Sequence, residues 1–170
     1  ALAAERAGYV VAADLSVRRL GRVRENAGRL GPLRLGLVAA DARRPPLRPL
    51  EGVLVDAPCT GTGTLRRHPD GKWRLTPRDL EALATLQAEI LRGAAEVVQA
   101  GGVLVYATCS LEAEENETQV ERFLEEHPEF RLESGPAPAA GTVDASGYLR
   151  VLPQAHGSDG AFAARMVRGG

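Results

Sequence analysis

The sequence is short of cysteine and of long apolar runs, and each shortage excludes a class of protein. Two cysteines in 170 residues cannot build a disulfide framework, and no group of Cys and His residues has the spacing of a zinc site. No apolar run is long enough to span a membrane, and no stretch has the pattern of a signal peptide. We therefore expect a cytoplasmic protein that binds neither a membrane nor a metal ion.

Two nucleotide-binding motifs are absent as well. The chain contains neither Gly-x-Gly-x-x-Gly nor Gly-x-x-x-x-Gly-Lys-Ser/Thr, which disfavours a dinucleotide-dependent dehydrogenase and a P-loop enzyme. Lys72 is the only lysine, and we interpret this preference for arginine as a coding bias without functional meaning. With 44% hydrophobic residues and a net charge of −1, the chain can form one domain with a substantial core.

Short apolar runs alternate with segments of helical periodicity. This alternation predicts an α/β fold with a mostly parallel sheet covered by helices on both faces. The expected strands are residues 9–13, 34–38, 52–55, 103–107, 130–133 and 161–167, and the expected helices are residues 16–30, 76–100 and 110–126. Thr76 and Ser110 are the predicted N-caps of the second and third helices. The second helix is assigned to core packing and to no chemistry.

Two further segments have a distinctive composition. After Ser110, the acidic residues Glu112, Glu114 and Glu115 suit the positive end of the third helix. Residues 134–147 are rich in Gly, Pro and Ala and have little to bury. We therefore expect a mobile loop over residues 134–147.

The first cysteine lies in a loop with the composition of an active site. Residues 52–63 read Gly-Val-Leu-Val-Asp-Ala-Pro-Cys-Thr-Gly-Thr-Gly, an apolar strand that runs directly into polar and reactive residues. Asp56 leaves the strand, Cys59 is a candidate nucleophile or acid, and Gly61 and Gly63 let the backbone approach a ligand closely. This pattern is typical of a loop at the carboxyl end of a parallel strand. The alternative is an ordinary β–α loop that carries a cysteine by chance.

The second cysteine occupies the same kind of position. Residues 101–110 read Gly-Gly-Val-Leu-Val-Tyr-Ala-Thr-Cys-Ser, so Cys109 comes just past the end of another apolar strand. Adjacent parallel strands deliver the residues at their carboxyl ends to one crevice. We therefore predict that Cys59 and Cys109 converge on one bound molecule.

Two acids and a basic segment complete the candidate site residues. Asp14 and Asp41 each follow a predicted strand, where α/β folds hold the ribose of a nucleotide, although Asp14 could equally cap the next helix. Residues 65–74 are rich in charge, Pro and Gly, and Trp73 among them could stack on a base or anchor the loop in the core. A solvated loop is the alternative to a phosphate-binding one. The basic candidates are Arg66, Arg67, Lys72 and Arg74.

Four motifs together resemble the RNA cytosine-C5 methyltransferases of the Fmu/Sun group. They are Asp-Ala-Pro-Cys-Thr-Gly-Thr-Gly, Arg-Arg-His-Pro-Asp-x-Lys-Trp, Leu-Val-Tyr-Ala-Thr-Cys-Ser followed by Glu-Glu-Asn, and His-Gly-Ser-Asp-Gly. The segment from Arg66 to Trp73 is most similar to the bacterial 16S ribosomal RNA enzymes. The resemblance implies a Rossmann-like class I fold dependent on S-adenosylmethionine (SAM), with an antiparallel last strand. Residues 1–170 would then form one partial catalytic domain that acts on RNA, with ribosomal RNA as the expected substrate.

The resemblance also implies a role for each site residue. Cys109 attacks C6 of a flipped-out cytosine, Cys59 assists release of the product, and Asp56 orients or protonates the base at the junction with the cofactor. Asp14 would hold the ribose of SAM, and Asp41 would lie near its adenine. Cysteine suits the attack because part of it is thiolate near neutral pH and because it leaves readily.

The sequence departs from the group in two respects. Ala161-Phe162 stands where two aromatic residues are usual, and the chain begins after the point where the group has its first strand and Gly-rich cofactor loop. We expect that missing strand to lie between the strands at residues 9–13 and 52–55, so the fragment alone would bind SAM weakly and be inactive. Other readings remain open: an RNA-binding module without catalysis, transfer RNA in place of ribosomal RNA, or a thiol redox pair.

Overall fold

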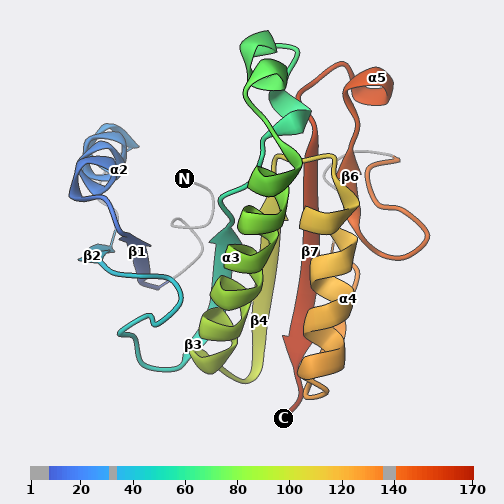
Figure 1. Cartoon of the computed structure of the whole chain (residues 1–170). Helices are drawn as coiled ribbons and strands as arrows, with labels where there is room; N and C mark the ends of the chain where they lie inside the picture. Colours follow the sequence, from blue (N-terminus) through green and yellow to red (C-terminus); the bar gives the residue numbers. More distant parts are fainter. Residues whose placement is uncertain (1–7, 31–33, 136–140) are drawn as a thin grey trace. The chain divides into compact units, whose positions relative to one another are not determined.

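The computed structural model describes residues 8–30, 34–135 and 141–170 (Figure 1). The chain divides into two compact units, Ala1–Pro46 and Leu47–Gly170. The first unit has a two-stranded sheet and the second a five-stranded sheet. Strands and helices alternate along both units, which confirms the predicted α/β class.

The first unit consists of two parallel strands and one helix. Strand β1 (Val10–Asp14) pairs with β2 (Leu35–Ala39) in a register that sets Asp14 beside Ala39. Helix α2 (Val17–Leu30) connects them, and the Ser16 hydroxyl accepts a hydrogen bond from the Arg19 N–H at 3.3 Å, as an N-cap does. Among the described residues of this unit only Leu20 is buried.

The second unit is built on a mixed sheet of order β3-β4-β7-β5, with β6 also paired to β7. Strands β3 (Leu50–Asp56) and β4 (Val98–Thr108) are parallel, with Asp56 beside Ala107. Strand β7 (Ala161–Arg168) runs antiparallel to β4, which confirms the predicted last strand. The short strands β5 (Phe130–Leu132) and β6 (Leu149–Val151) are antiparallel to β7.

Helices α3 (Pro77–Glu96) and α4 (Glu117–Glu126) lie against one face of this sheet (Figure 1). The helices described in this unit therefore do not form the expected cover on both faces. Alternate residues of β4 and β7 point into the core on that face, among them the fully buried Leu104, Tyr106 and Met166. Thr76 forms a capping box with Asp79 at the start of α3, so this predicted N-cap is confirmed. None of the helices in the described ranges is long and apolar enough to cross a membrane.

Two element boundaries differ from the sequence-based expectation. Helix α3 ends at Glu96 and β4 begins at Val98, because the apolar residues at the predicted helix end join the sheet instead. Helix α4 begins at Glu117, so the prediction that Ser110 caps it is wrong. A loop and the 3-10 helix η3 (Ala113–Glu115) fill the interval, because Ser110 and Glu115 bond to the neighbouring loop instead. The short helix α5 (Pro153–His156) and β6 were not predicted.

The segment expected to be mobile is described only in part, since residues 136–140 lie outside the described ranges. Around Asp144 the chain is held by hydrogen bonds from the Tyr148 N–H at 3.0 Å and from the Arg150 side chain at 2.6 Å. Thr142 is buried beside it. The mobility of residues 134–147 as a whole stays a prediction.

Candidate active site

The two thiols meet at the carboxyl ends of β3 and β4. The strands end at Asp56 and Thr108, and the Ala57 N–H donates to the Ala107 carbonyl at 2.9 Å just beyond β3. This pairing carries the two loops forward together, so the sulfur atoms of Cys59 and Cys109 lie 3.4 Å apart. The predicted convergence of the two cysteines is confirmed.

Two glycines allow three backbone segments to meet beside Cys109. The Gly63 N–H donates to the Cys109 carbonyl at 2.9 Å, and the Gly63 carbonyl accepts from the Gly160 N–H at 2.8 Å. A Cβ atom on Gly63 would lie 2.7 Å from the Cys109 carbonyl oxygen and 2.8 Å from the Gly160 Cα, so only glycine fits there. The Ser-Asp-Gly turn that precedes β7 is thereby tied to both thiol loops.

Burial and the neighbouring sulfur make the Cys59 thiol a weaker acid than an ordinary cysteine. Desolvation, followed by the hydrogen bond with Cys109, raises the pKa of the Cys59 thiol to about 12. Cys59 therefore keeps its proton near neutral pH and can donate a hydrogen bond to the Cys109 sulfur. Asp56, the third residue predicted for this site, ends β3 and is exposed.

The two predicted cofactor acids belong to the first unit, at one edge of its sheet. The Asp14 carboxylate accepts hydrogen bonds from Arg19 at 2.7 and 2.8 Å and from the Ser16 N–H at 2.7 Å. Asp41 lies just beyond β2 and pairs with Arg43 at 2.7 Å. These arginine hydrogen bonds are the largest cause that lowers the pKa of each acid below its usual value. Since Ser16 takes the cap position of α2, the interpretation of Asp14 as the helix cap is wrong.

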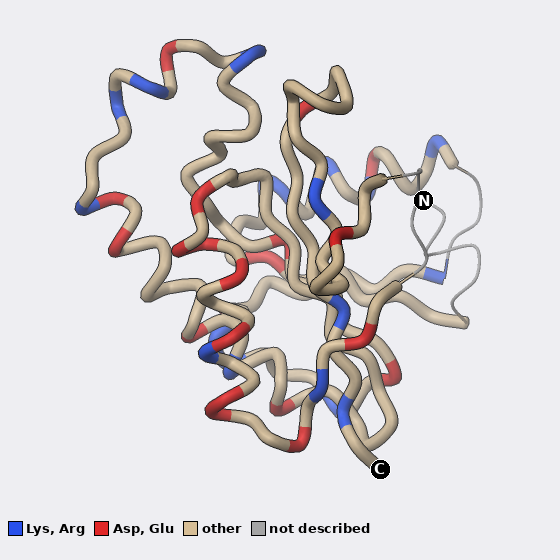
Figure 2. The backbone as a smooth tube through the Cα atoms, turned by 90° about the vertical axis from the view of Figure 1, so that its right-hand side faces the viewer, with Lys and Arg blue, Asp and Glu red and all other residues tan. Residues whose placement is uncertain are grey.

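The basic segment forms an exposed loop beyond the thiols, at the top of the second unit in Figure 1. The 3-10 helix η1 (Thr62–Thr64) precedes it, and it contains the 3-10 helix η2 (Pro69–Trp73). Figure 2 shows its basic positions in blue with one acidic position between them. Trp73 is 81% exposed, so it does not anchor the loop in the core. The Lys72 ammonium lies 4.7 Å from the centre of the Trp73 ring.

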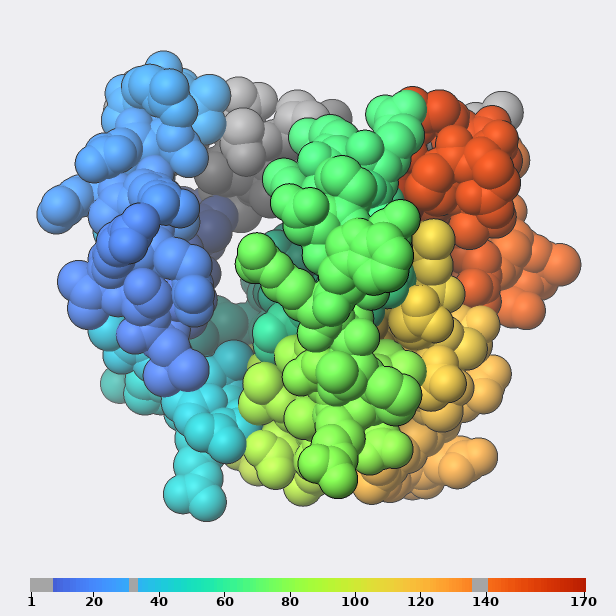
Figure 3. Space-filling view, turned by 45° about the horizontal axis from the view of Figure 1, so that its top comes forward, coloured from blue at the N-terminus to red at the C-terminus, as the bar shows by residue number. Residues whose placement is uncertain are grey.

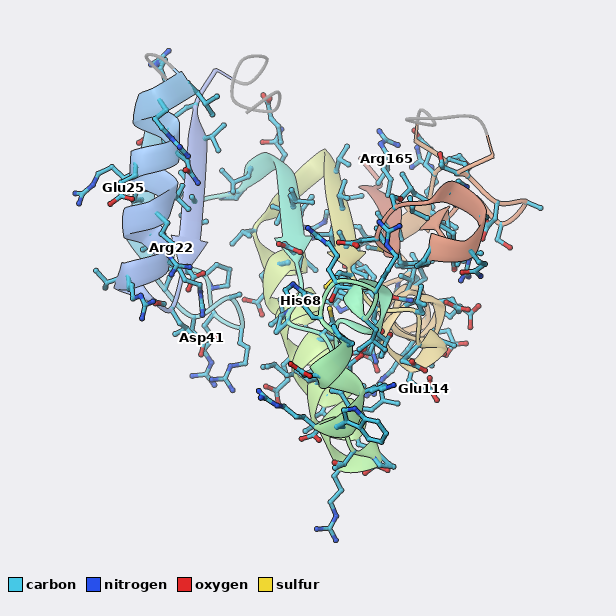
Figure 4. The ribbon with its side chains drawn as sticks, turned by 90° about the horizontal axis from the view of Figure 1, so that it is seen from above. Arg22, Glu25, Asp41, His68, Glu114 and Arg165 are labelled. Atoms are coloured by element: carbon cyan, nitrogen blue, oxygen red, sulfur yellow. The ribbon has the colours of Figure 1, made fainter. Side chains whose placement is uncertain are left out.

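One basic side chain of this loop is already engaged. Arg67 forms an ion pair with Asp159 of the turn before β7. In Figure 3, which brings this end of the molecule forward, the green loop lies beside the orange-red segment around α5. The ion pair therefore holds the loop against the turn that contacts the thiol loops. His68 of the same loop is exposed and is labelled in Figure 4.

Residues 1–167 match the family model described as 16S rRNA methyltransferase RsmB/F. The chain belongs to this family. It is 41% identical over 164 residues to the protein named ribosomal RNA small subunit methyltransferase B of Yersinia pseudotuberculosis and of Yersinia pestis. That match covers 94% of this chain and 37% of the relative, so the chain spans little more than a third of the relatives' length.

Solved structures give the same result for the fold of this RsmB/F chain. NSun6 from Pyrococcus horikoshii, solved with SFG, is 33% identical with a TM-score of 0.84, over 95% of this chain and 41% of that one. A methyltransferase homologue from Pyrococcus horikoshii is 30% identical with a TM-score of 0.78, over 95% of this chain and 53% of that one. The Rossmann-like methyltransferase fold expected from the sequence is therefore confirmed.

The RsmB/F chain also contains two site residues that the sequence reading missed. Glu115 and Gln87 are fully buried, and both contact the loop that carries Cys59. Gln87 lies at the spacing of the apolar stripe of α3, where a polar residue on the buried face is an available signal. Glu115 belongs to the Glu-Glu-Asn motif, but the acidic run suggested a helix start instead.

The acids of the RsmB/F chain suit the polar end of a nucleoside. A carboxylate offers about four acceptor positions. Asp14 Oδ2 accepts a hydrogen bond from Arg19 Nε, and this oxygen can also accept one from a ribose hydroxyl. The ion pairs of Asp14 and Asp41 are partly exposed, and such pairs contribute little stability. A ligand can therefore compete with the arginines for these carboxylates.

Proposed function

We propose that this chain is the catalytic part of an enzyme that methylates C5 of a cytosine in RNA, with ribosomal RNA as the substrate. The observation that carries the proposal is the pair of thiols 3.4 Å apart at the ends of adjacent parallel strands, in a chain of the RsmB/F family. C5 of cytosine is a poor nucleophile, so methyl transfer to it needs a group that first adds to C6 and later leaves. A thiol does both.

Cys109 is the proposed nucleophile. Its sulfur forms a bond to C6 of the cytosine, and the electrons displaced from the C5–C6 double bond make C5 nucleophilic, while Asp56 orients or protonates the base near N3. C5 then gains the methyl group. Loss of the C5 proton to a base re-forms the double bond and expels the Cys109 thiolate. The target cytosine has to be unpaired or flipped out for its C6 to reach the sulfur.

Cys59 is the proposed release catalyst. Its raised pKa supports this division of labour, because a thiol that keeps its proton is a poor competitor for the attack on C6. The same thiol is suited to interact with the Cys109 sulfur as that sulfur leaves the ring. The two sulfur atoms lie within hydrogen-bonding distance of each other, so Cys59 can assist Cys109 without an intervening residue.

S-adenosylmethionine is the proposed cofactor, and when bound it supplies an electrophilic methyl group. Asp14 would accept hydrogen bonds from its ribose, Asp41 would lie near its adenine, and Asp56 would border both cofactor and base. The acceptor chemistry of Asp14 and its position at the carboxyl end of β1 support this assignment. These three residues bind and orient; the reacting groups of the protein are the thiols.

The exposed basic loop is the proposed contact with RNA. Arg66, Arg67, Lys72 and Arg74 offer cationic groups to phosphates, and the exposed ring of Trp73 can stack on an unpaired base. The loop follows directly from the Cys59 loop, which supports a role in holding the strand near the reacting cytosine. The same loop in a protein without catalysis would be an RNA-binding module.

Methyl transfer tests the proposal. The full-length polypeptide is incubated with labelled SAM and an unmodified ribosomal RNA transcript, and the nucleosides are analysed by mass spectrometry. We expect 5-methylcytidine with the unaltered protein and none with Cys109→Ala. Cys59→Ala should accumulate a covalent protein–RNA adduct on ordinary RNA, because the methylated intermediate cannot release. Binding of the transcript without any methylated product would indicate the RNA-binding module, and full activity of Cys109→Ala would contradict the mechanism.

A further inference from the structure

The carboxyl group of Glu115 is in an unusual environment. Glu115 is 0% exposed, and fully buried acids are rare unless their oxygens are satisfied. Within the described ranges no salt bridge to Glu115 is formed, and its oxygens accept hydrogen bonds from uncharged groups. The Glu115 carboxyl group is therefore neither in contact with solvent nor part of a salt bridge among the described residues.

Three donors point at this carboxyl group, and two of them come from the residue after Cys59. The Thr60 N–H lies 2.9 Å from Oε1 and 3.2 Å from Oε2, and the Thr60 hydroxyl donates to Oε2. The Gln87 amide donates to Oε1 at 2.9 Å. Glu115 therefore fixes both the backbone and the side chain of Thr60.

Gln87 holds the other side of the same cysteine. Its Nε2 also donates to the Pro58 carbonyl at 2.8 Å. Both partners of Nε2 are acceptors, which sets the orientation of the amide without ambiguity. Pro58 and Thr60, the two neighbours of Cys59, are thus each bound by a buried polar side chain.

The same network reaches the second thiol loop. The Tyr106 hydroxyl donates to the Glu115 backbone carbonyl at 2.6 Å, which fixes Glu115 relative to β4. The Thr60 and Ser110 hydroxyls lie 3.2 Å apart, and Ser110 follows Cys109 directly. Any displacement of Glu115 therefore changes the position of Cys59 relative to Cys109.

We propose that Glu115, supported by Gln87, is a positioning residue that holds the Cys59 thiol against Cys109 for the release step. The inference rests on the proposed function, since it assigns to Glu115 the geometry on which release depends. A carboxylate only accepts hydrogen bonds, so it suits three converging donors, and hydrogen bonds to a charged acceptor are strong. Glutamine at this position replaces one carboxylate oxygen by an NH₂ group with little change of volume. That NH₂ group then faces a donor of Thr60 or Gln87, so a hydrogen bond is lost.

The test is a comparison of covalent adducts on ordinary RNA. Glu115→Gln in the full-length polypeptide should still attack the base, transfer about one methyl group per enzyme, and then accumulate the protein–RNA adduct, as Cys59→Ala does. Steady-state turnover should fall by about 100-fold, as expected for misplacement of a reacting group by about 1 Å. The adduct on a denaturing gel is a readout that a general loss of stability does not produce.

Glu114→Gln is the matched control. Glu114 is the exposed neighbour of Glu115, and Figure 4 shows it at the periphery of the molecule, so the substitution removes the same charge without touching the thiol loops. We expect unaltered turnover and no accumulated adduct for this variant. An adduct formed equally by both variants would overturn the positioning role.

Two further variants separate the possible failures. If Glu115→Gln does not fold, Gln87→Met serves instead, because it removes both hydrogen bonds from Gln87. This variant should accumulate the same adduct. If folded Gln87→Met forms no adduct, the inference is contradicted. Normal turnover of Glu115→Gln contradicts it as well. If Cys59→Ala forms the adduct and folded Glu115→Gln does not, only the role of Glu115 is refuted. If Cys59→Ala forms no adduct, the proposed mechanism of release is refuted.

Discussion

The two units of the chain hold their candidate functional residues in different ways. In the second unit the thiol loops rest on a contiguous buried core and on a network of buried polar side chains. In the first unit only Leu20 is buried among the described residues, and Asp14 and Asp41 are held by partly exposed ion pairs with neighbouring arginines. One site is fixed by packing and the other by local contacts.

The two arrangements are compatible with the two proposed roles. Attack and release by two sulfur atoms need a fixed separation, and a reacting group is positioned best by residues that are themselves immobilised by packing. Carboxylates that bind a ribose or border an adenine can adjust when the ligand arrives.

The largest expected effect concerns the two cores. Leu91 is 1% exposed inside the second unit, and its replacement by Ala should lower the free energy of opening of β4 by about 2–5 kcal/mol. Leu20→Ala in the first unit should lower the free energy of opening of β1 by roughly half of that or less, because no other described residue of this unit is buried. Hydrogen exchange followed peptide by peptide measures both values separately. Equal losses would show that the two units are equally well packed.

A smaller effect separates two basic surfaces. We expect that Arg66→Ala with Arg67→Ala weakens RNA binding and lowers the slope of log K against log salt by up to about two, because two phosphate contacts are lost. The control is Arg22→Ala with Arg24→Ala, which removes two exposed arginines from α2 in the first unit. This control should leave the slope unchanged. The reverse result would assign the RNA contact to α2 and leave the loop to solvent.

The sequence predicts the thiol pair well, and the reasons are physical. An apolar strand that ends in a reactive loop is visible in the residues themselves, and two such strands in a parallel sheet must present their loops at the same edge. The structure accordingly sets Cys59 and Cys109 at 3.4 Å. The capping box at Thr76 is equally local, and it was predicted correctly.

The residues that position the thiols could not be predicted in this way. Glu112, Glu114 and Glu115 after a serine favour a helix start locally, but α4 begins only at Glu117, because Glu115 bonds to a loop that lies far away in sequence. Val97 and Val98 continue the apolar stripe of α3, but Val98 belongs to β4. Its pairing with Leu50 of β3 decides its conformation there, and the helical periodicity of the sequence does not. In each case a partner distant along the chain decides the outcome.

The identity of the residue that bonds to RNA tests the central claim most directly. In RNA that carries 5-fluorocytosine at the target position, fluorine replaces the C5 proton that has to leave, so the adduct persists. The full-length polypeptide is reacted with this RNA and SAM, digested with protease and nuclease, and analysed by mass spectrometry. We predict that the nucleotide is attached to Cys109, in the unaltered protein and in Glu115→Gln alike. A nucleotide attached to Cys59 would contradict the account.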